Sequence, residues 1–211
     1  MKRSEEKRSN RPGTVKRSDY EAGKSSDNRE KILATALTLF TERGFSGTPT
    51  SLISKEAGVA TGTLFFYFTT KEELIDTLYR HIKSEAAQVM CRDFGREKTA
   101  IAKLRRIGFN AIEWGIENPA KQKFMEQFAY SPFVSTNAHE EGMSHFLFLR
   151  DLVGDGISEG TIRNIDPDLL FCMMASSFSG LIARAYTEKD PARRKKIVNE
   201  GLDFIFNGMK T

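Results

Sequence analysis

The segment between positions 61 and 67 holds side chains that could contact a nucleic acid: Thr61, Gly62, Thr63, Phe66 and Tyr67. In a helix, Leu64 and Phe68 are four residues apart and would face inward, which leaves the other side chains toward solvent. Threonine hydroxyls can hydrogen-bond phosphate oxygens, whereas rings and methyl groups can contact the methyl group of thymine. Considered alone, however, this apolar run could equally be a buried strand or a core helix.

The flanking residues favour a helix that reads a DNA groove. Leu52, Ile53 and Ala57 would line one side of a preceding helix, and Gly58 supplies a turn. Two helices joined by a short glycine turn have the geometry that inserts a recognition helix into the major groove. Thr70 and Glu73 form a capping box for the next helix, and its positive dipole end together with Lys71 predicts a phosphate contact there.

Most of the excess positive charge lies outside this segment. The 211 residues carry a net charge of +4, residues 1–27 hold eight basic against five acidic side chains, and residues 28–80 are electrically balanced. Residues 1–27 contain too few apolar side chains to offset the entropy of ordering them, so we predict a disordered basic arm. This arm is either a solvated tail or a further contact to phosphates.

Prolines indicate where helices begin. Thr48, Asn118, Asp166 and Asp190 are capping residue types that each precede a proline, and proline at the first helical position loses no hydrogen bond. The first helix is expected to begin at an Asp27 and Glu30 capping box and to end at Gly44. No run alternates with a period of two, so we predict an all-α fold of about nine helices. Their predicted ranges are 28–44, 49–57, 60–67, 71–94, 98–116, 119–130, 139–158, 166–187 and 191–208.

The segment AGVATGTLFFYFTTKEEL, from Ala57 to Leu74, resembles the signature of TetR-family transcriptional regulators, and the preceding GFSGTPT turn resembles that family too. The resemblance implies a three-helix helix-turn-helix DNA-binding domain, which we place at 28–80, and a helical ligand-binding and dimerisation domain at 81–211. It also implies repression of the chain's own or a neighbouring operon until a small molecule binds. The DNA contacts of the family fall on Thr50, Ser51, Thr61, Gly62, Thr63, Phe65, Phe66, Tyr67 and Lys71.

Two departures from the family pattern affect base recognition. Phe65 stands where members often have tyrosine, and neither Ser51 nor Thr61 is an arginine, so the usual bidentate reading of guanine is missing there. We therefore expect discrimination through thymine methyl groups and DNA shape.

Large apolar residues are frequent beyond His81, and the default explanation for each is core packing. Phenylalanine is nonetheless abundant, with 16 copies, and methionines add an adaptable surface. We therefore expect a cavity for an apolar or aromatic small molecule. The residues expected to line it are Trp114, Phe124, Phe128, Met143, Phe146, Met173 and Phe178.

The last two predicted helices each carry an apolar stripe. They could pack as an intrachain bundle or as a four-helix interface across a two-fold axis, and the TetR resemblance implies the second arrangement. A homodimer would place two recognition helices on a palindromic double-stranded operator. The expected interface residues are Met174, Leu181, Ile182, Ile197, Val198, Leu202 and Ile205.

A helical enzyme is the main rival class, and its motifs are missing. His139 and His145 lack metal-ligand spacing, and neither a GxSxG elbow nor a glycine-rich phosphate loop appears, so we expect no catalytic residue, metal or cofactor. Charges interrupt the apolar runs and the N-terminus is polar, so we expect a cytoplasmic protein without a membrane partner. An architectural DNA-binding protein without an effector would share the same helix-turn-helix and stays an alternative.

Overall fold

The computed structural model describes residues 17–211, with side chains from Asp27 onward. The predicted all-α class is confirmed, because every regular element in this part of the chain is a helix. A short 3₁₀ turn, Phe94–Arg96, separates α4 from α5. The α-helices are α1 (Arg17–Arg43), α2 (Thr50–Glu56), α3 (Thr61–Tyr67), α4 (Lys71–Met90), α5 (Ala100–Glu117), α6 (Pro119–Phe128), α7 (Thr136–Ser144), α8 (Phe148–Ser158), α9 (Pro167–Tyr186) and α10 (Pro191–Met209).

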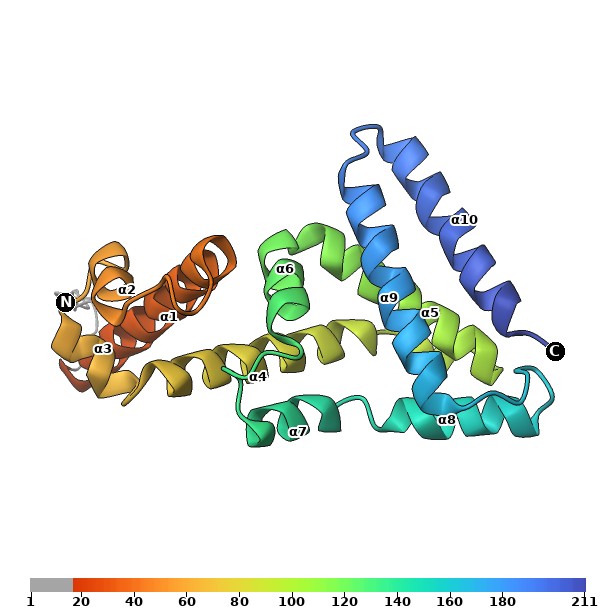
Figure 1. Ribbon diagram of the computed structural model, residues 1–211, viewed down its shortest axis with the longest axis horizontal. Helices are drawn as coiled ribbons and strands as arrows, with labels where there is room; N and C mark the ends of the chain where they lie inside the picture. The colour runs from red at the N-terminus through yellow and green to blue at the C-terminus, as the bar shows by residue number, and fades with distance from the viewer. Residues whose placement is uncertain (1–16) are drawn as a thin grey trace, which may run out of the picture.

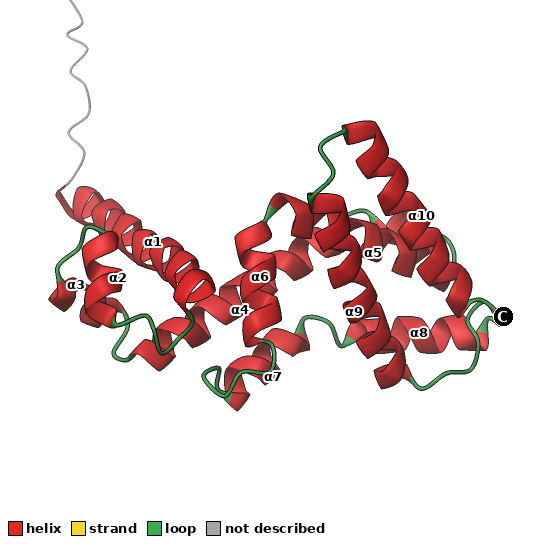
Figure 2. Ribbon diagram, turned by 45° about the horizontal axis from the view of Figure 1, so that its top comes forward, coloured by secondary structure: helices red, strands yellow, loops and turns green. Residues whose placement is uncertain are grey.

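Helices α1, α2 and α3 form a small head at one end of the molecule, and α4 leads from this head into a larger body (Figure 1). Helix α4 is continuous through His81, where we placed the domain boundary. Helices α5, α8, α9 and α10 pack together at the far end, and α6 and α7 flank α4 between the two ends (Figure 2). A rigid helix therefore connects the head to the body.

Polar caps start several helices where the sequence predicted them. The side chains of Asp166 and Asp190 accept hydrogen bonds from the amides of Leu169 (2.8 Å) and Ala192 (3.1 Å), and proline follows each cap. Asn118 precedes α6 without a side-chain cap. The expectation for Thr48 is wrong, because Pro49 takes the cap position of α2. The buried Thr48 hydroxyl lies within hydrogen-bond distance of the carbonyl oxygens of Leu39 in α1 (3.1 Å) and of Gly44 (2.8 Å).

The predicted start of the first helix is also wrong. Helix α1 begins at Arg17, so residues 17–27 of the predicted disordered arm are helical, whereas residues 1–16 of that arm lie outside the described residues. Asp27 is therefore not a cap, and its carboxylate instead accepts a hydrogen bond from Lys31 (2.5 Å), one turn further along. Once an apolar segment has nucleated a helix, each added residue gains a backbone hydrogen bond, so a polar extension needs no core of its own.

The single helix predicted at 139–158 is two helices, α7 and α8. Between them, backbone hydrogen bonds span three residues instead of four, as in Phe146 N to Met143 O (2.9 Å) and Leu147 N to Ser144 O (3.3 Å). The Ser144 hydroxyl also donates to the Glu141 carbonyl oxygen (2.6 Å) and so competes for an acceptor of the helix ladder. These effects change the chain direction without disturbing the apolar periodicity on which the prediction relied.

Two buried clusters hold the molecule together. The first joins the head to α4, α6 and α7, and it includes Phe40 of α1 and Phe124 and Phe128 of α6. The second lies among α5, α8, α9 and α10. The first cluster thus extends well beyond the predicted head, so the position of the head relative to α6 and α7 is fixed by apolar packing.

Candidate nucleic-acid interface

A left-handed glycine creates the turn between α2 and α3. Gly58 has φ +66°, a conformation that disfavours side chains with a Cβ, and the amide of Val59 donates to the Ser54 carbonyl oxygen (3.0 Å). The Ser54 and Thr61 hydroxyls lie 3.1 Å apart and join the two helices directly. The predicted turn at Gly58 is therefore confirmed, as is the left-handed Gly44 (φ +70°) that ends α1.

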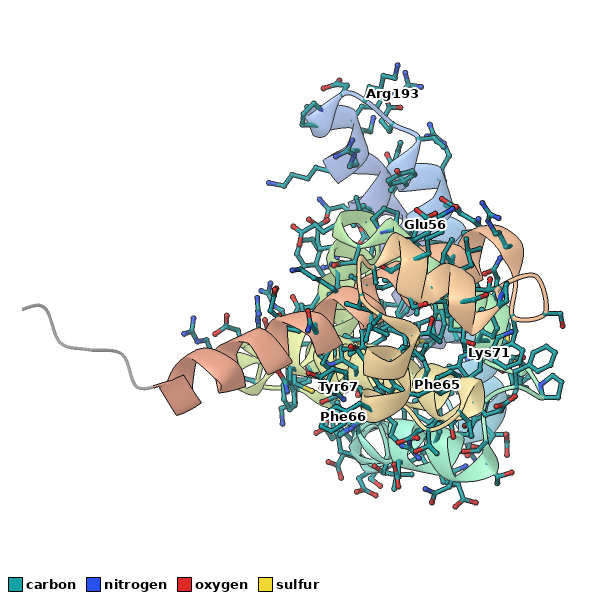
Figure 3. All side chains as sticks on the ribbon, turned by 90° about the vertical axis from the view of Figure 1, so that its left-hand side faces the viewer. Glu56, Phe65, Phe66, Tyr67, Lys71 and Arg193 are labelled. Atoms are coloured by element: carbon teal, nitrogen blue, oxygen red, sulfur yellow. The ribbon has the colours of Figure 1, made fainter. Side chains whose placement is uncertain are left out.

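Helix α3 buries one face and exposes an aromatic one. Leu64 and Phe68 are fully enclosed in the first core cluster, as the four-residue spacing predicted. Phe66 is 79% exposed and Phe65 is 45% exposed at the end of the molecule that carries the head (Figure 3). The Phe66 and Tyr67 rings meet edge to face with centroids 5.1 Å apart. Exposure of a phenylalanine to this extent has no stabilising role within the chain, so this face is available to an external partner.

The other predicted DNA contacts on α2 and α3 are glycine, serine and threonine residues. Ser51, Thr61 and Gly62 are exposed, whereas Thr50 and Thr63 are half-buried. Gly62 has open space where a Cβ would lie, so nothing within the chain requires a glycine there. The structure thus brings eight of the nine predicted DNA contacts together on the free surface of α2 and α3.

Lys71 is the exception. Its ammonium donates to the carbonyl oxygen of Phe45 (2.5 Å) and lies 4.0 Å from the centroid of the Phe45 ring. Burial lowers the pKa of Lys71 from its usual value. The Thr70 cap beside it is confirmed, because Thr70 accepts from the Glu73 amide (3.0 Å), while the Glu73 carboxylate accepts from the amide of Thr69 (2.7 Å), one residue before the cap. Lys71 thus has an acceptor within the chain, supplied by the turn at Phe45, and its contact to a phosphate stays a prediction.

The seven residues predicted to line an effector cavity are distributed over different packing clusters. Trp114, Phe124 and Phe128 are buried in the first core cluster, where the Phe128 ring lies 6.2 Å from that of Phe40 in the head. Phe146 and the exposed Met143 lie beside Lys83 at the end of α7, whereas Met173 is exposed on α9 and Phe178 packs toward Gly108 of α5. Their common role as the lining of an effector cavity stays a prediction.

The predicted dimer residues are also mostly internal. Met174, Ile182, Val198 and Leu202 are buried in the second core cluster, and the remaining three, Leu181, Ile197 and Ile205, are partly buried against it. The exposed apolar side chains of these helices are different ones: Leu169, Met173 and Tyr186 on α9 and Phe204 on α10. The prediction selected the wrong face, because both helices are apolar on more than one side and periodicity cannot tell which side packs within the chain.

The histidines of the described residues lie among ordinary structural contacts. Tyr79 is buried, its hydroxyl lies 3.1 Å from Nδ1 of His139, and burial raises its pKa to about 12. Within residues 17–211, no three histidine, cysteine, aspartate or glutamate side chains are grouped so that they could hold a metal ion.

Comparison with known proteins gives a consistent result. The family described as bacterial regulatory proteins, tetR family, matches residues 32–81. A crystal structure of a tetR-family transcription regulator from Shewanella sp. PV-4 is 26% identical, covers 87% of this chain and 98% of its own, and superposes with a TM-score of 0.78. The transcriptional repressor KstR2 of Mycobacterium tuberculosis is 25% identical over 203 residues, which are 90% of this chain and 97% of that protein.

One similar structure contains a bound molecule. The transcriptional regulator FadR of Bacillus subtilis, solved in complex with stearoyl-CoA, is 20% identical and superposes with a TM-score of 0.68 over 85% of this chain and 98% of its own. At this level of identity the likeness concerns the fold. It extends over head and body alike.

Proposed function

The chain belongs to the TetR family of DNA-binding transcriptional regulators, and from that premise we propose that it represses its own or a neighbouring operon until a small molecule releases it from the operator. The observation that carries the proposal is the exposed aromatic and hydroxyl face of α3, which lies on the same rigid unit as the start of α4. Any tilt of α4 would therefore move the recognition surface.

We propose that bases are read through thymine methyl groups and DNA shape. The side chains on the free surface of α2 and α3 offer hydroxyls and rings, and neither helix contains an arginine. Guanine is most often recognised by the bidentate arginine contact, so guanine-rich half-sites have no matching donor here. Selection of bound sequences from random duplex DNA should return palindromes whose half-sites are rich in A·T pairs. Recovery of G·C-rich half-sites would contradict this reading.

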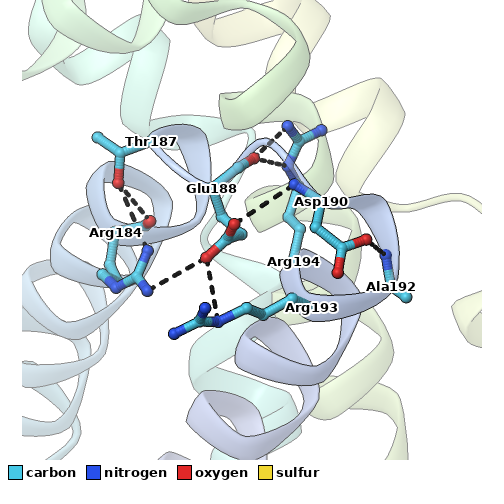
Figure 4. Close-up of polar contacts among 7 residues, drawn as sticks. All are labelled: Arg184, Thr187, Glu188, Asp190, Ala192, Arg193 and Arg194. Atoms are coloured by element: carbon cyan, nitrogen blue, oxygen red, sulfur yellow. Dashed lines mark hydrogen bonds and ion pairs between the residues drawn. The ribbon is translucent and has the colours of Figure 1, made fainter.

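We propose a homodimer built on the exposed faces of α9 and α10. Helix α9 is long and apolar enough to cross a membrane by length and composition, yet only 22% of that stretch is buried within the chain. The α9–α10 connection is held firmly, since the Glu188 carboxylate pairs with Arg184 and Arg193 and its carbonyl oxygen accepts from Arg194 (Figure 4). A second copy would cover the exposed apolar face and use the helix pair as one rigid unit. Recovery of the protein in the membrane fraction of lysed cells would oppose this reading.

The proposed effector is an apolar or aromatic small molecule. Similarity to FadR, solved with stearoyl-CoA, and to KstR2, described as a ketosteroid transcriptional regulator, supports an effector of this kind. The effector must bind more tightly to the conformation that does not bind DNA than to the one that does. Equal affinity for both conformations would leave their populations unchanged. The partly buried Phe178, which crowds Gly108 between α5 and α9, is a side chain that an entering molecule could displace.

The test combines operator selection with a compound screen. The selected duplex is immobilised with the full chain bound, and fatty acyl thioesters, steroids and aromatic acids are added in turn. We expect one of these classes to dissociate the complex at micromolar concentration. If the complex with a specific operator resists every class, the chain acts as an effector-independent DNA-binding protein. If no specific operator emerges, the repressor proposal itself fails.

A further inference from the structure

A pocket of about 330 Å³ lies at the junction of head and body, away from the α3 surface. Its walls come from three helices that meet along α4, with α1 on one side and α7 on the other (Figure 1). The lining residues are Arg29 of α1, Thr77, Arg80, His81 and Ser84 of α4, and Glu141 and His145 at the end of α7.

The carboxylate in this lining is already occupied. One Glu141 oxygen accepts from Nε of Arg80, and the other accepts from Nδ2 of Asn137 (2.8 Å). The nearby Glu85 of α4 is similarly engaged, because it accepts from Lys121 (2.6 Å) and from the Trp114 indole (3.2 Å). Among the described residues, neither carboxylate therefore forms a salt bridge with Arg29, His81 or His145.

Among the described residues, no carboxylate forms a hydrogen bond or salt bridge with the remaining nitrogen-bearing side chains of the pocket, although Glu85 and His81 interact electrostatically. Arg29 lies over the Phe68 ring, 5.6 Å from its centroid, and pairs with no carboxylate. His81 and His145 are exposed and make no hydrogen bond or ion pair within the described chain. Thr77 and Ser84 add two hydroxyls to the same wall of α4. The lining thus presents an excess of hydrogen-bond donors from three separate elements.

A second hollow of the molecule does not have this excess of hydrogen-bond donors without paired carboxylates. That hollow, of about 260 Å³, is also lined by two arginines, Arg105 and Arg106. Both are paired, Arg105 with Asp203 (2.6 Å) and Arg106 with Glu97 (3.3 Å). Both arginines of the second hollow are therefore paired, whereas in the junction pocket Arg80 is paired and Arg29, within the described chain, is not.

We propose that the pocket at the junction binds the phosphoryl group of a small phosphorylated metabolite. A guanidinium, two imidazoles and two hydroxyls can donate to several oxygens of one tetrahedral anion, and arginine suits phosphate geometry in particular. The volume of about 330 Å³ leaves room for a small organic group attached to the phosphate. This site is separate from the apolar effector site proposed above.

The position of the pocket couples its occupant to the head. Arg29 belongs to the head, whereas Glu141 and His145 belong to the body, so a bound phosphate would bridge the two parts. If the chain is the proposed repressor, the bound phosphorylated metabolite changes the affinity of the chain for its operator. Because coupling is reciprocal, the operator then changes the affinity for the metabolite by the same factor. Direct binding of the metabolite requires no such premise.

The test is isothermal titration of the full chain with ribose 5-phosphate and with inorganic phosphate at low ionic strength. We expect saturable binding of one ribose 5-phosphate per chain, competition by phosphate, and no binding of ribose. Arg29→Gln and His145→Gln should each weaken ribose 5-phosphate binding by roughly 10-fold, the loss typical of one charge-assisted hydrogen bond. Arg105→Gln, which removes the same charge from the second hollow, should leave the affinity unchanged.

Three results would overturn the proposal. If Arg105→Gln weakens ribose 5-phosphate binding as much as the pocket variants do, the binding is nonspecific attraction to positive charge. If succinate binds more tightly than phosphate, the pocket is a carboxylate site. If both pocket variants bind ribose 5-phosphate like the parent protein, the anion binds elsewhere. Circular dichroism and thermal melting verify that each variant is folded. If the chain binds phosphate specifically but no operator is found, this inference holds and the repressor proposal fails.

Discussion

At the scale of single residues, we expect DNA recognition to depend most directly on Phe66. Its ring is 79% exposed and contacts the edge of Tyr67, so its removal leaves the core of the head intact. Phe66→Ala should lower affinity for the selected operator by roughly 10-fold, because the loss of recognition at one base pair typically costs about 1–3 kcal/mol. Electrophoretic mobility shift with the selected duplex measures the loss. Tyr130→Ala removes a ring that is also exposed but lies after α6, and it should bind like the parent protein.

Lys83 of α4 is a charged residue in an apolar setting. Its ammonium lies over the rings of Tyr79 (5.6 Å) and Phe146 (5.3 Å), and its hydrogen-bond partner is the sulfur of Met143 (3.6 Å). Burial lowers the pKa of Lys83 from 10.5 to about 8. Between about pH 8 and pH 10.5, Lys83 is protonated in the unfolded chain but has lost its proton in the folded chain. The free energy of unfolding therefore rises with pH across this window.

Replacement of Lys83 by methionine should therefore stabilise the protein. At pH 7 the folded state carries the full cost of burying the charge, and Lys83→Met should raise the free energy of unfolding by about 1–3 kcal/mol. It should also remove the gain in stability between pH 8 and pH 10 that the parent protein shows. Urea denaturation at several pH values measures both effects, with the exposed Lys98→Met as the control. A lower stability of Lys83→Met at pH 7 would show that the ammonium is a net stabilising group.

At the scale of the helices, glycines allow α5 to approach the terminal pair closely. A Cβ on Gly115 would lie 2.6 Å from the Cδ1 atom of Ile182 in α9, and a Cβ on Gly108 would lie 2.7 Å from the Phe178 ring. The body therefore depends on the absence of these side chains, and the contact between α5 and α9 cannot widen without loss of buried apolar area.

Gly115→Ala tests this close contact. We expect it to destabilise the protein by about 1–3 kcal/mol, because overpacking forces side chains away from their preferred rotamers. Adding Ile182→Val removes the clashing Cδ1 methyl and should recover part of the loss. Gly154→Ala in α8, where a Cβ meets nothing within 4 Å, should be neutral or slightly stabilising. Equal effects of Gly115→Ala and Gly154→Ala on the thermal midpoint would contradict the close contact.

At the scale of the whole molecule, the exposed side chains of α9 and α10 predict how two copies associate. Met173 is 56% exposed and Phe204 is 83% exposed, on a helix pair that the second core cluster holds rigid. Met173→Glu and Phe204→Glu should each shift the protein toward monomers and weaken operator binding by at least about 10-fold, because a buried unpaired charge opposes association. Sedimentation equilibrium measures the first effect and mobility shift the second.

The matching control introduces a charge elsewhere. Tyr130→Glu alters an exposed aromatic residue after α6, remote from α9 and α10 in the chain, and it should leave the association state unchanged. A parent protein that sediments as a monomer, or Met173→Glu and Phe204→Glu variants that associate as tightly as the parent, would contradict the proposed interface.

The sequence by itself determined the features that depend on neighbouring residues. The glycine turn at Gly58, the inward spacing of Leu64 and Phe68, the Thr70 cap and the helix starts at Pro167 and Pro191 all follow from interactions within about one helical turn. Such interactions are the same wherever the segment lies, so the fold class and the helix-turn-helix could be predicted from spacing, whereas the family came from the resemblance of the segment from Ala57 to Leu74.

The tertiary structure decided every feature that depends on a distant partner. It turned Lys71 toward the Phe45 carbonyl, placed Phe128 against Phe40 of the head, and directed Val198 and Leu202 into the core in place of a dimer interface. It also brought Arg29, His81 and His145 to one pocket, although 64 residues of chain separate the last two. Helical periodicity shows that a face is apolar, but which surface covers that face depends on contacts between residues far apart in the chain.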